Sequence, residues 1–67
     1  MIALTINGAA RSFPSPLNVT QLIEQLELAG KRVALERNGE IVPRGSFALT
    51  QLASGDVLEI VVAVGGG

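Results

Sequence analysis

Two Asn-Gly dipeptides constrain the fold of this chain more than any other feature of its sequence. An Asn-Gly pair is the strongest short signal for a β-hairpin, because both residues tolerate the positive φ angles of a two-residue turn. The first pair, Asn7-Gly8, follows residues 1–6, in which large apolar side chains alternate with smaller or polar ones. This period of two predicts a strand with one buried face, and residues 9–13 are expected to return beside it.

The second pair, Asn38-Gly39, predicts another hairpin between strands at residues 33–37 and 40–43. A connection at residues 44–53 follows, and a Ser-Gly-Asp turn then leads into the last predicted strand at residues 57–62. Glu59 is expected on the solvent face of that strand. The side chains expected to face the core are Phe47, Leu49 and Leu52 in the connection and Leu58, Ile60 and Val62 in the strand.

A helix is predicted between the two hairpins. It begins at Asn18, a favoured N-cap residue, and Gln21 three positions later completes a capping-box pair. Gly30 is expected to end it as a left-handed residue, which gives roughly three turns. Leu17 and Leu22 are placed to form a hydrophobic staple across the start of the helix. The stripe that a sheet would cover has the spacing i, i+3, i+4, i+7 and consists of Val19, Leu22, Ile23 and Leu26.

The order of two strands, a helix and three further strands indicates an α+β domain with a mixed sheet and the helix across one face. The near-continuous apolar run at residues 60–64 is typical of a buried strand, so the first and last strands are expected to pair in parallel at the centre. The ubiquitin-like β-grasp fold has this arrangement. We expect residues 1–64 to form this domain and residues 65–67 to form a C-terminal tail.

The composition excludes several classes of function. The net charge is −1 and the five basic residues are scattered, so no nucleic-acid surface is indicated. The chain has no Cys and no His, and thus lacks the usual thiol nucleophile, neutral-pH general base and transition-metal ligands. No apolar run reaches membrane-spanning length and no leader is recognisable. We expect a cytoplasmic protein that is not an enzyme, binds no metal or cofactor of its own, and does not contact a membrane.

The sequence ends on three glycines, Gly65, Gly66 and Gly67. Glycine has no Cβ, so such a segment is thin and adopts backbone angles closed to other residues. Three extended residues reach roughly 10 Å, enough to carry a terminal carboxylate into a narrow active site while the domain stays outside. A glycine run is also a common form of frayed terminus. Its position directly after the last strand favours the functional interpretation, and we expect it to be unordered in the free protein.

Four residues are candidates for contacts with a partner. Val61 and Val64 are expected to lie off the core face near the tail and to form an apolar docking patch. Arg37 and Arg44 flank the second hairpin and are placed to meet an acidic patch, although solvated surface arginines are the commoner case.

The chain resembles the ThiS family, the sulfur carriers of thiamin biosynthesis. The resemblance covers essentially the whole chain and includes the length, the first Asn-Gly hairpin and the Gly-Asp turn before the last strand. The segments that carry it are Asn7-Gly8, residues 19–23 (VTQLI), residues 33–44 (VALERNGEIVPR), Gly55-Asp56 and residues 59–67 (EIVVAVGGG).

The resemblance implies that partner enzymes act on the carboxylate of Gly67, with Gly65 and Gly66 as its approach. An adenylyltransferase similar to ubiquitin-activating enzymes is expected to join that carboxylate to AMP, using Mg-ATP. Sulfur from a cysteine desulfurase route is then expected to displace AMP and leave a thiocarboxylate. Thiazole synthase is expected to take this sulfur into the thiazole ring.

Three other functions remain open at this stage. A molybdopterin-type sulfur carrier would share the fold and the tail, and a ubiquitin-like modifier would join target lysines through Gly67. A passive interaction module would not need the tail at all. Co-purification with thiazole synthase, isopeptide-linked adducts and the effect of deleting Gly66 and Gly67 distinguish these cases.

Overall fold

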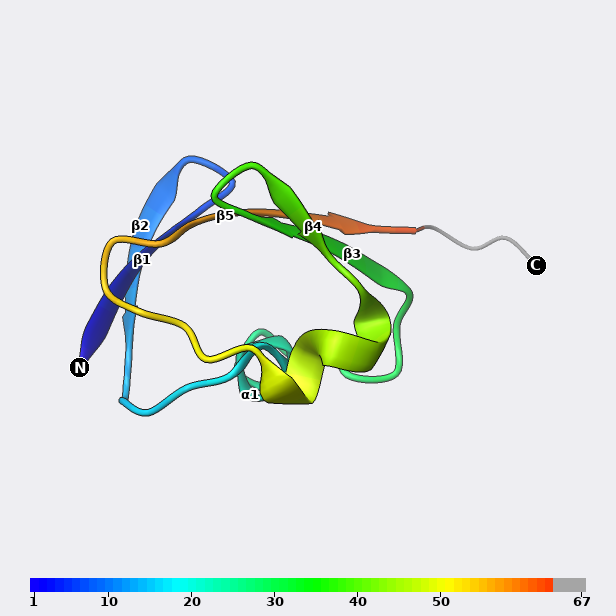
Figure 1. The fold of residues 1–67 in the computed structure, drawn as a ribbon, viewed down its shortest axis with the longest axis horizontal. Coiled ribbons are helices and arrows are strands. Elements are labelled where there is room, and N and C mark those ends of the chain that lie inside the picture. Colours follow the sequence, from blue (N-terminus) through cyan, green and yellow to red (C-terminus); the bar gives the residue numbers. More distant parts are fainter. Residues whose placement is uncertain (64–67) are drawn as a thin grey trace.

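The computed structural model describes residues 1–63 of the chain, and its elements follow the predicted order (Figure 1). The predictions for Val64 and for the tail at residues 65–67 therefore concern residues outside the described part of the chain. The strands are β1 (Ile2–Ile6), β2 (Ala9–Phe13), β3 (Val33–Arg37), β4 (Glu40–Val42) and β5 (Val57–Val62). The helix α1 spans Val19–Gln25, and a 3₁₀ helix, η1, spans Arg44–Leu49.

The five strands form one mixed sheet in the order β2-β1-β5-β3-β4. The first and last strands pair in parallel, with Thr5 opposite Val57, as the sequence predicted. All other pairs are antiparallel, and β5 lies at the centre of the sheet between β1 and β3. In Figure 1, β5 runs from the side of the molecule on which the N-terminus lies to the opposite side.

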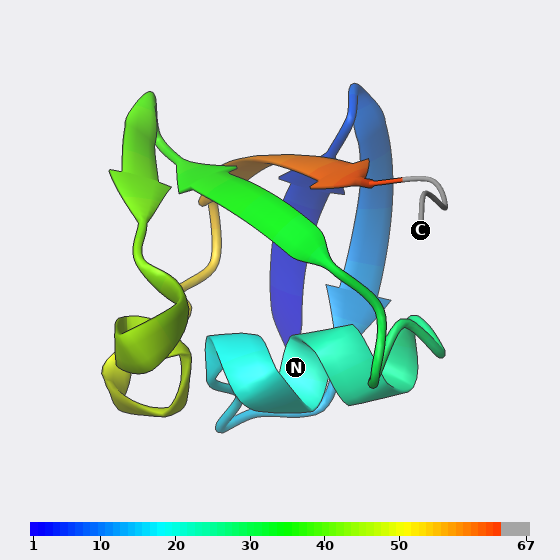
Figure 2. The same cartoon turned by 90° about the vertical axis from the view of Figure 1, so that its right-hand side faces the viewer.

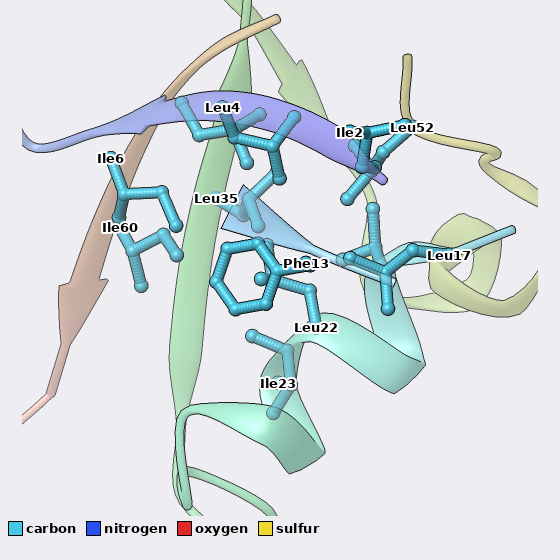
Figure 3. Close-up of a cluster of buried hydrophobic side chains, with 12 residues drawn as sticks. Ile2, Leu4, Ile6, Phe13, Leu17, Leu22, Ile23, Leu35, Leu52 and Ile60 are labelled. Carbon is cyan, nitrogen blue, oxygen red and sulfur yellow. The ribbon is translucent and has the colours of Figure 1, made fainter. Parts of the chain in front are cut away.

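The core lies between one face of the sheet and α1. Figure 2 shows α1 and η1 on the same side of the sheet, with η1 beneath β4. Side chains from β1, β2, β3 and α1 point towards one another in this layer (Figure 3). The alternation of buried and exposed residues along β1 and β5 matches the predicted period of two. The core residues are Ile2, Leu4, Ile6, Phe13, Leu17, Val19, Leu22, Ile23, Leu35, Leu52, Leu58 and Ile60.

The start of α1 is the predicted capping box. The Asn18 side chain accepts from the Gln21 N–H at 2.8 Å, and the Gln21 side chain accepts from the Asn18 N–H at 2.8 Å. These two bonds satisfy donors that a helix N-terminus otherwise leaves unpaired. Leu17 and Leu22 are both buried beneath this turn, consistent with the predicted staple.

The predicted end of the helix at Gly30 is wrong. The helix ends at Gln25 and closes through a Schellman motif, in which Leu28 N–H donates to Ile23 carbonyl oxygen at 2.9 Å. Glu27 takes the left-handed position of that motif, with φ of 60°. Leu28 then packs against the core, and this apolar anchor accounts for an end that precedes the glycine. Gly30, at φ 84°, belongs to the following turn.

The connection between β4 and β5 corrects a second expectation. Leu52 is buried and Phe47 is partly buried against the core, as predicted. Leu49, however, is 82% exposed at the end of η1. The tight 3₁₀ turn places Phe47 towards the core and leaves Leu49 facing solvent, because residues two apart do not share a face of a helix.

A buried carboxylate organises the turn that enters β5. Asp56 accepts from Arg37 Nε at 2.8 Å, from Asn38 Nδ2 at 3.1 Å and from the Ala53 N–H at 2.9 Å. Burial alone would raise the pKa of Asp56, but the hydrogen bonds from Ala53, Arg37 and Asn38 and the charge of Arg37 outweigh it. The pKa of Asp56 is therefore held below its ordinary value. The network ties the second hairpin to the beginning of β5.

We predict that Glu27→Gly stabilises the protein by roughly 0.5–1 kcal/mol. Glycine adopts the left-handed conformation of this position without the steric cost that a side chain brings. Part of this gain is offset because glycine loses more backbone entropy on folding. Chemical denaturation measures the change. Glu27→Ala removes the same carboxylate but keeps the backbone cost, and should bring no such gain. Equal stabilisation by the two substitutions would contradict this account of the helix end.

We predict that Asp56→Asn lowers the unfolding free energy by about 1–3 kcal/mol at neutral pH, because an amide offers fewer acceptors to three converging donors. The pKa of Asp56 is lower in the folded protein than in the unfolded chain, where it is about 3.9. Ionised Asp56 therefore stabilises the folded protein when the pH is above that unfolded value, and this stabilisation is lost as the pH falls through the folded pKa. The difference between wild type and variant should thus shrink below about pH 4.

Urea unfolding across this range measures the difference, and Glu40→Gln, which alters an exposed carboxylate on β4, is the matched control. A stability difference for Asp56→Asn that stays constant down to acid pH would contradict the role of the ionised carboxylate.

Candidate functional site

The candidate site is the C-terminal end of β5, where the described chain leads towards the glycine tail. On the β3 side, Ala63 N–H donates to the Arg32 carbonyl at 2.9 Å, and Asn38 N–H donates to the Val57 carbonyl at 2.7 Å. The odd-numbered residues of β5 therefore bond with β3, as alternate residues do in an antiparallel pair. Pairing with β3 holds the chain up to Ala63, one residue beyond the end of the strand.

On the opposite side of β5, the Asn7 side chain extends the sheet beyond the end of β1. Its Oδ1 accepts from the Ile60 N–H at 2.7 Å and its Nδ2 donates to the Ile60 carbonyl at 3.0 Å. The Asn7 N–H also donates to the Leu58 carbonyl at 2.9 Å. The Asn7 side-chain amide thus replaces a pair of backbone hydrogen bonds at the point where β1 turns into β2. The even-numbered residue that follows, Val62, has no described partner on this edge.

The Asn residues of both hairpin turns bind β5. Asn7 and Asn38 have φ angles of 50° and 51°, as an Asn-Gly turn requires. Asn38 Oδ1 accepts from the Val57 N–H at 2.9 Å, while Asn7 binds Ile60 three residues further along. The two turns therefore form the hairpins and also fix the central strand. The dipeptides were the sequence signal for these residues, but their contacts with β5 depend on the order of the strands.

A groove of about 370 Å³ lies beside the end of β5. Two arginines, Arg32 and Arg44, line it together with apolar side chains from the paired ends of β3 and β5. The groove brings together two of the predicted contact residues, Val61 and Arg44. Its full lining is Arg32, Val33, Ala34, Arg44, Val61 and Ala63.

The other predicted contact residues lie elsewhere or outside the described part. Val61 is 65% exposed, off the core face as expected. Arg37 is not in the groove, because its guanidinium pairs with Asp56 at the other end of β5. Val64, Gly65, Gly66 and Gly67 lie beyond residue 63. Arg32 was not predicted, although its place just before the strand at 33–37 puts it opposite the end of an antiparallel neighbour.

Three further hollows lie elsewhere on the described surface. One of about 550 Å³ beside α1 is lined in part by Pro14, Pro16 and Gln21 and contains no predicted site residue. Arg44 also lines a hollow of about 470 Å³ on the α1 side of the sheet, and Arg37 lines one of about 320 Å³ beside β4. Within residues 1–63, no cluster of three or more acidic, Cys or His side chains is suited to hold a metal ion. Among these same residues, no helix has the length and apolar character needed to cross a membrane.

Comparison with known proteins places this geometry in a family. The chain covers all of the crystal structure of the thiamine biosynthesis protein ThiS from Geobacter metallireducens, with a TM-score of 0.81, 36% identity and 98% of this chain included. This likeness confirms the ubiquitin-like β-grasp fold. The chain is also 35% identical to the uncharacterized protein ycf40 of Pyropia yezoensis, over 98% of this chain and 93% of that protein.

A thiazole synthase of Paramagnetospirillum magneticum is 45% identical over 64 residues, which are 96% of this chain. The chain spans only a fifth (20%) of the length of that protein. The model of the ThiS family matches residues 4–67, nearly the whole sequence including the three terminal glycines. The chain therefore belongs to the ThiS family, the sulfur carrier proteins of thiamin biosynthesis that its sequence resembles.

Proposed function

We propose that this chain carries sulfur as a thiocarboxylate on Gly67 and delivers it for formation of the thiamin thiazole ring. The observation that carries the proposal is the extent of the family match, which runs through residue 67 and so includes the glycines as well as the domain. The geometry at the end of β5 supports it, because a backbone hydrogen bond holds Ala63 beside β3 and the strand leads directly into the segment that carries the glycines.

The chemistry requires activation of the terminal carboxylate, because a carboxylate is a poor acceptor for a sulfur nucleophile. In the proposed first step, a Gly67 oxygen attacks the α-phosphorus of ATP, pyrophosphate leaves, and an acyl-adenylate forms. A hydrosulfide sulfur then attacks the acyl carbon, AMP leaves, and a thiocarboxylate remains. Where the donor is a persulfide, a further thiol must cleave the S–S bond of the acyl disulfide.

The partner enzymes supply the catalysis in this proposal. An adenylyltransferase similar to ubiquitin-activating enzymes uses ATP and Mg²⁺, and a cysteine desulfurase route supplies the sulfur. This chain contributes the reacting carboxylate and a surface that partners recognise. Gly65 and Gly66 leave the approach to that carboxylate narrow, since neither has a Cβ.

Thiazole synthase is the proposed acceptor of the sulfur. The supporting observation is that a protein named thiazole synthase contains a segment 45% identical to almost all of this chain. A second thiazole synthase, from Magnetococcus marinus, is 32% identical over 92% of this chain. A carrier-like segment within such a polypeptide links the two components in one molecule, which supports a functional contact between them when they are separate.

The test is the intact mass of the protein after incubation with the adenylyltransferase, Mg-ATP and hydrosulfide. We expect one oxygen to be replaced by sulfur, with fragmentation placing the change at Gly67. ATP–pyrophosphate exchange measures the adenylation step separately. We expect it to depend on this chain.

The matched control lacks Gly66 and Gly67 and retains every described contact, so it should fold normally and remain unmodified. An unmodified wild-type terminus, with an enzyme proven active on its own carrier, would contradict the proposal. Modification of the control at another residue would also contradict it.

A further inference from the structure

The dipeptide that forms each hairpin turn is also chemically reactive. In an Asn-Gly pair, the backbone nitrogen of the glycine can attack the side-chain carbon of the asparagine, because the glycine has no Cβ to hinder the approach. The chain has two such pairs, Asn7-Gly8 and Asn38-Gly39. Both asparagines hold β5 through their side-chain amides, so a chemical change in either amide affects the central strand.

The reaction replaces the side-chain amide by a carboxylate. At Asn7, the nitrogen of Gly8 loses its proton and bonds to Cγ, and the side-chain nitrogen leaves as ammonia. Water then opens the resulting cyclic imide. Cleavage of the new bond between Cγ and nitrogen leaves an aspartate, whereas cleavage at the original peptide carbon leaves an isoaspartate, in which the main chain runs through Cγ. In sum, water is consumed, ammonia is released, and nothing is oxidised or reduced.

Two hydrogen bonds restrain the amide of Asn7 in the folded protein. Its Oδ1 accepts from the Ile60 N–H at 2.7 Å, and its Nδ2 donates to the Ile60 carbonyl at 3.0 Å. Both bonds direct the amide at β5, so its carbon must leave this position to meet the nitrogen of Gly8. Attack therefore requires a local opening in which Asn7 has separated from Ile60, and the frequency of this opening limits the rate.

The two asparagines differ in how firmly they are held. Asn38 Nδ2 donates to Asp56 at 3.1 Å, and Asn38 Oδ1 accepts from the Val57 N–H at 2.9 Å. Because Asp56 is buried within the network that ties the second hairpin to β5, Asn38 separates only when that network opens. The side chain of Asn7 binds a single residue, Ile60, at a point where β1 has ended. Asn7 is therefore the asparagine that opens more often.

The product of the reaction cannot keep both contacts with Ile60. An amide donates and accepts, whereas an ionised carboxylate only accepts. One oxygen of an aspartate at position 7 still suits the Ile60 N–H, but the other faces the Ile60 carbonyl across the 3.0 Å that Nδ2 now spans. Two acceptors at this distance repel, and the carbonyl is left without its donor. An isoaspartate also lengthens the main chain within the turn, which displaces the side chain.

We propose that Asn7 is a deamidation site, and that its conversion to aspartate or isoaspartate releases the later part of β5 from the first hairpin. On that side of β5, the Asn7 amide continues the sheet past the end of β1. Without it, β3 alone holds the end of the strand, through the pairs that lead to Val62 and the bond from Ala63 to Arg32. The protein thus carries a one-way switch at the strand that leads to the tail.

The rate of deamidation in the wild-type protein tests whether the fold controls the site. The protein is kept at mildly alkaline pH with and without urea, and its proteolytic peptides are followed by mass spectrometry. We expect Asn7 to react at least about tenfold more slowly in the folded protein than in urea, because only the opened state reacts. Within the folded protein, Asn7 should react faster than Asn38. Equal rates for Asn7 in the two conditions, a faster reaction at Asn38, or no reaction at Asn7 in the folded protein would each overturn the proposal.

The variant Asn7→Asp tests the structural consequence. The Ile60 amide should exchange at least about fivefold faster than in the wild type, because the repelled side chain no longer holds it. The matched control is Asn18→Asp, which makes the same change of charge at the N-cap of α1. Asn18 uses its oxygen as the acceptor there, and Asp caps a helix as well as Asn does, so exchange at Ile60 should stay unchanged.

Equal protection of Ile60 in Asn7→Asp and the wild type would overturn the proposed release of β5. Equal loss of protection in Asn18→Asp would overturn it too, since charge rather than the lost contact would then be the cause. If Asn7→Asp does not fold, exchange in partly deamidated wild-type protein gives the same readout. There, rapid exchange at Ile60 confined to the molecules deamidated at Asn7 supports the proposal, and uniform exchange contradicts it.

Discussion

The structure depends on how the central strand β5 is held along both edges. Its first half pairs with β1 in parallel and its whole length pairs with β3. Where β1 ends, the Asn7 amide continues the pairing by binding both backbone groups of Ile60. Asp56 and Asn38 hold the beginning of the strand. A strand fixed in this way leaves the core at a defined point and in a defined direction.

This constraint connects the fold to the proposed function. Ordering a flexible segment in a partner costs about 1–2 kcal/mol per residue, so a short free segment keeps that cost small. In the proposed function, the partner would order the residues that follow Ala63, which a backbone hydrogen bond to Arg32 holds beside β3.

Different rows of the same strands form the core and the outer surface of the domain. Leu58 and Ile60 of β5 are buried with Leu35 of β3 in the core. Their neighbours Glu59 and Glu36 face solvent as an unpaired like-charge row. Core and surface residues are separated in this way because successive side chains of a strand point to opposite faces of the sheet.

Much of the fold could be predicted from local signals in the sequence. The Asn-Gly turns, the capping box at Asn18 and the period-two strands are each determined by neighbours along the chain, and all are present. The helix end was misplaced because Leu28 packs on the core and closes the helix with Glu27 in a glycine-like conformation. Leu49 was assigned to the core from its type alone, and the turn geometry of η1 exposes it.

The candidate site was less predictable because it depends on strand order. The exposure of Val61 follows from the alternation along β5, and it was predicted correctly. The contacts of Asn7 with Ile60 and of Arg37 with Asp56 join residues 53 and 19 positions apart. The proximity of Arg32 to Ala63 likewise requires the antiparallel register of β3 and β5. No local pattern specifies these contacts, whereas the topology does.

Amide hydrogen exchange along β5 tests most directly whether Asn7 fixes the strand that leads to the tail. In the wild-type protein the Ile60 amide should exchange slowly and the Val62 amide rapidly, because only the former has a described hydrogen-bond partner. Asn7→Gly keeps the positive φ of the turn and removes the amide, so Ile60 should exchange at least about tenfold faster while Leu58 stays protected. An Ile60 amide equally protected in both proteins would contradict the account.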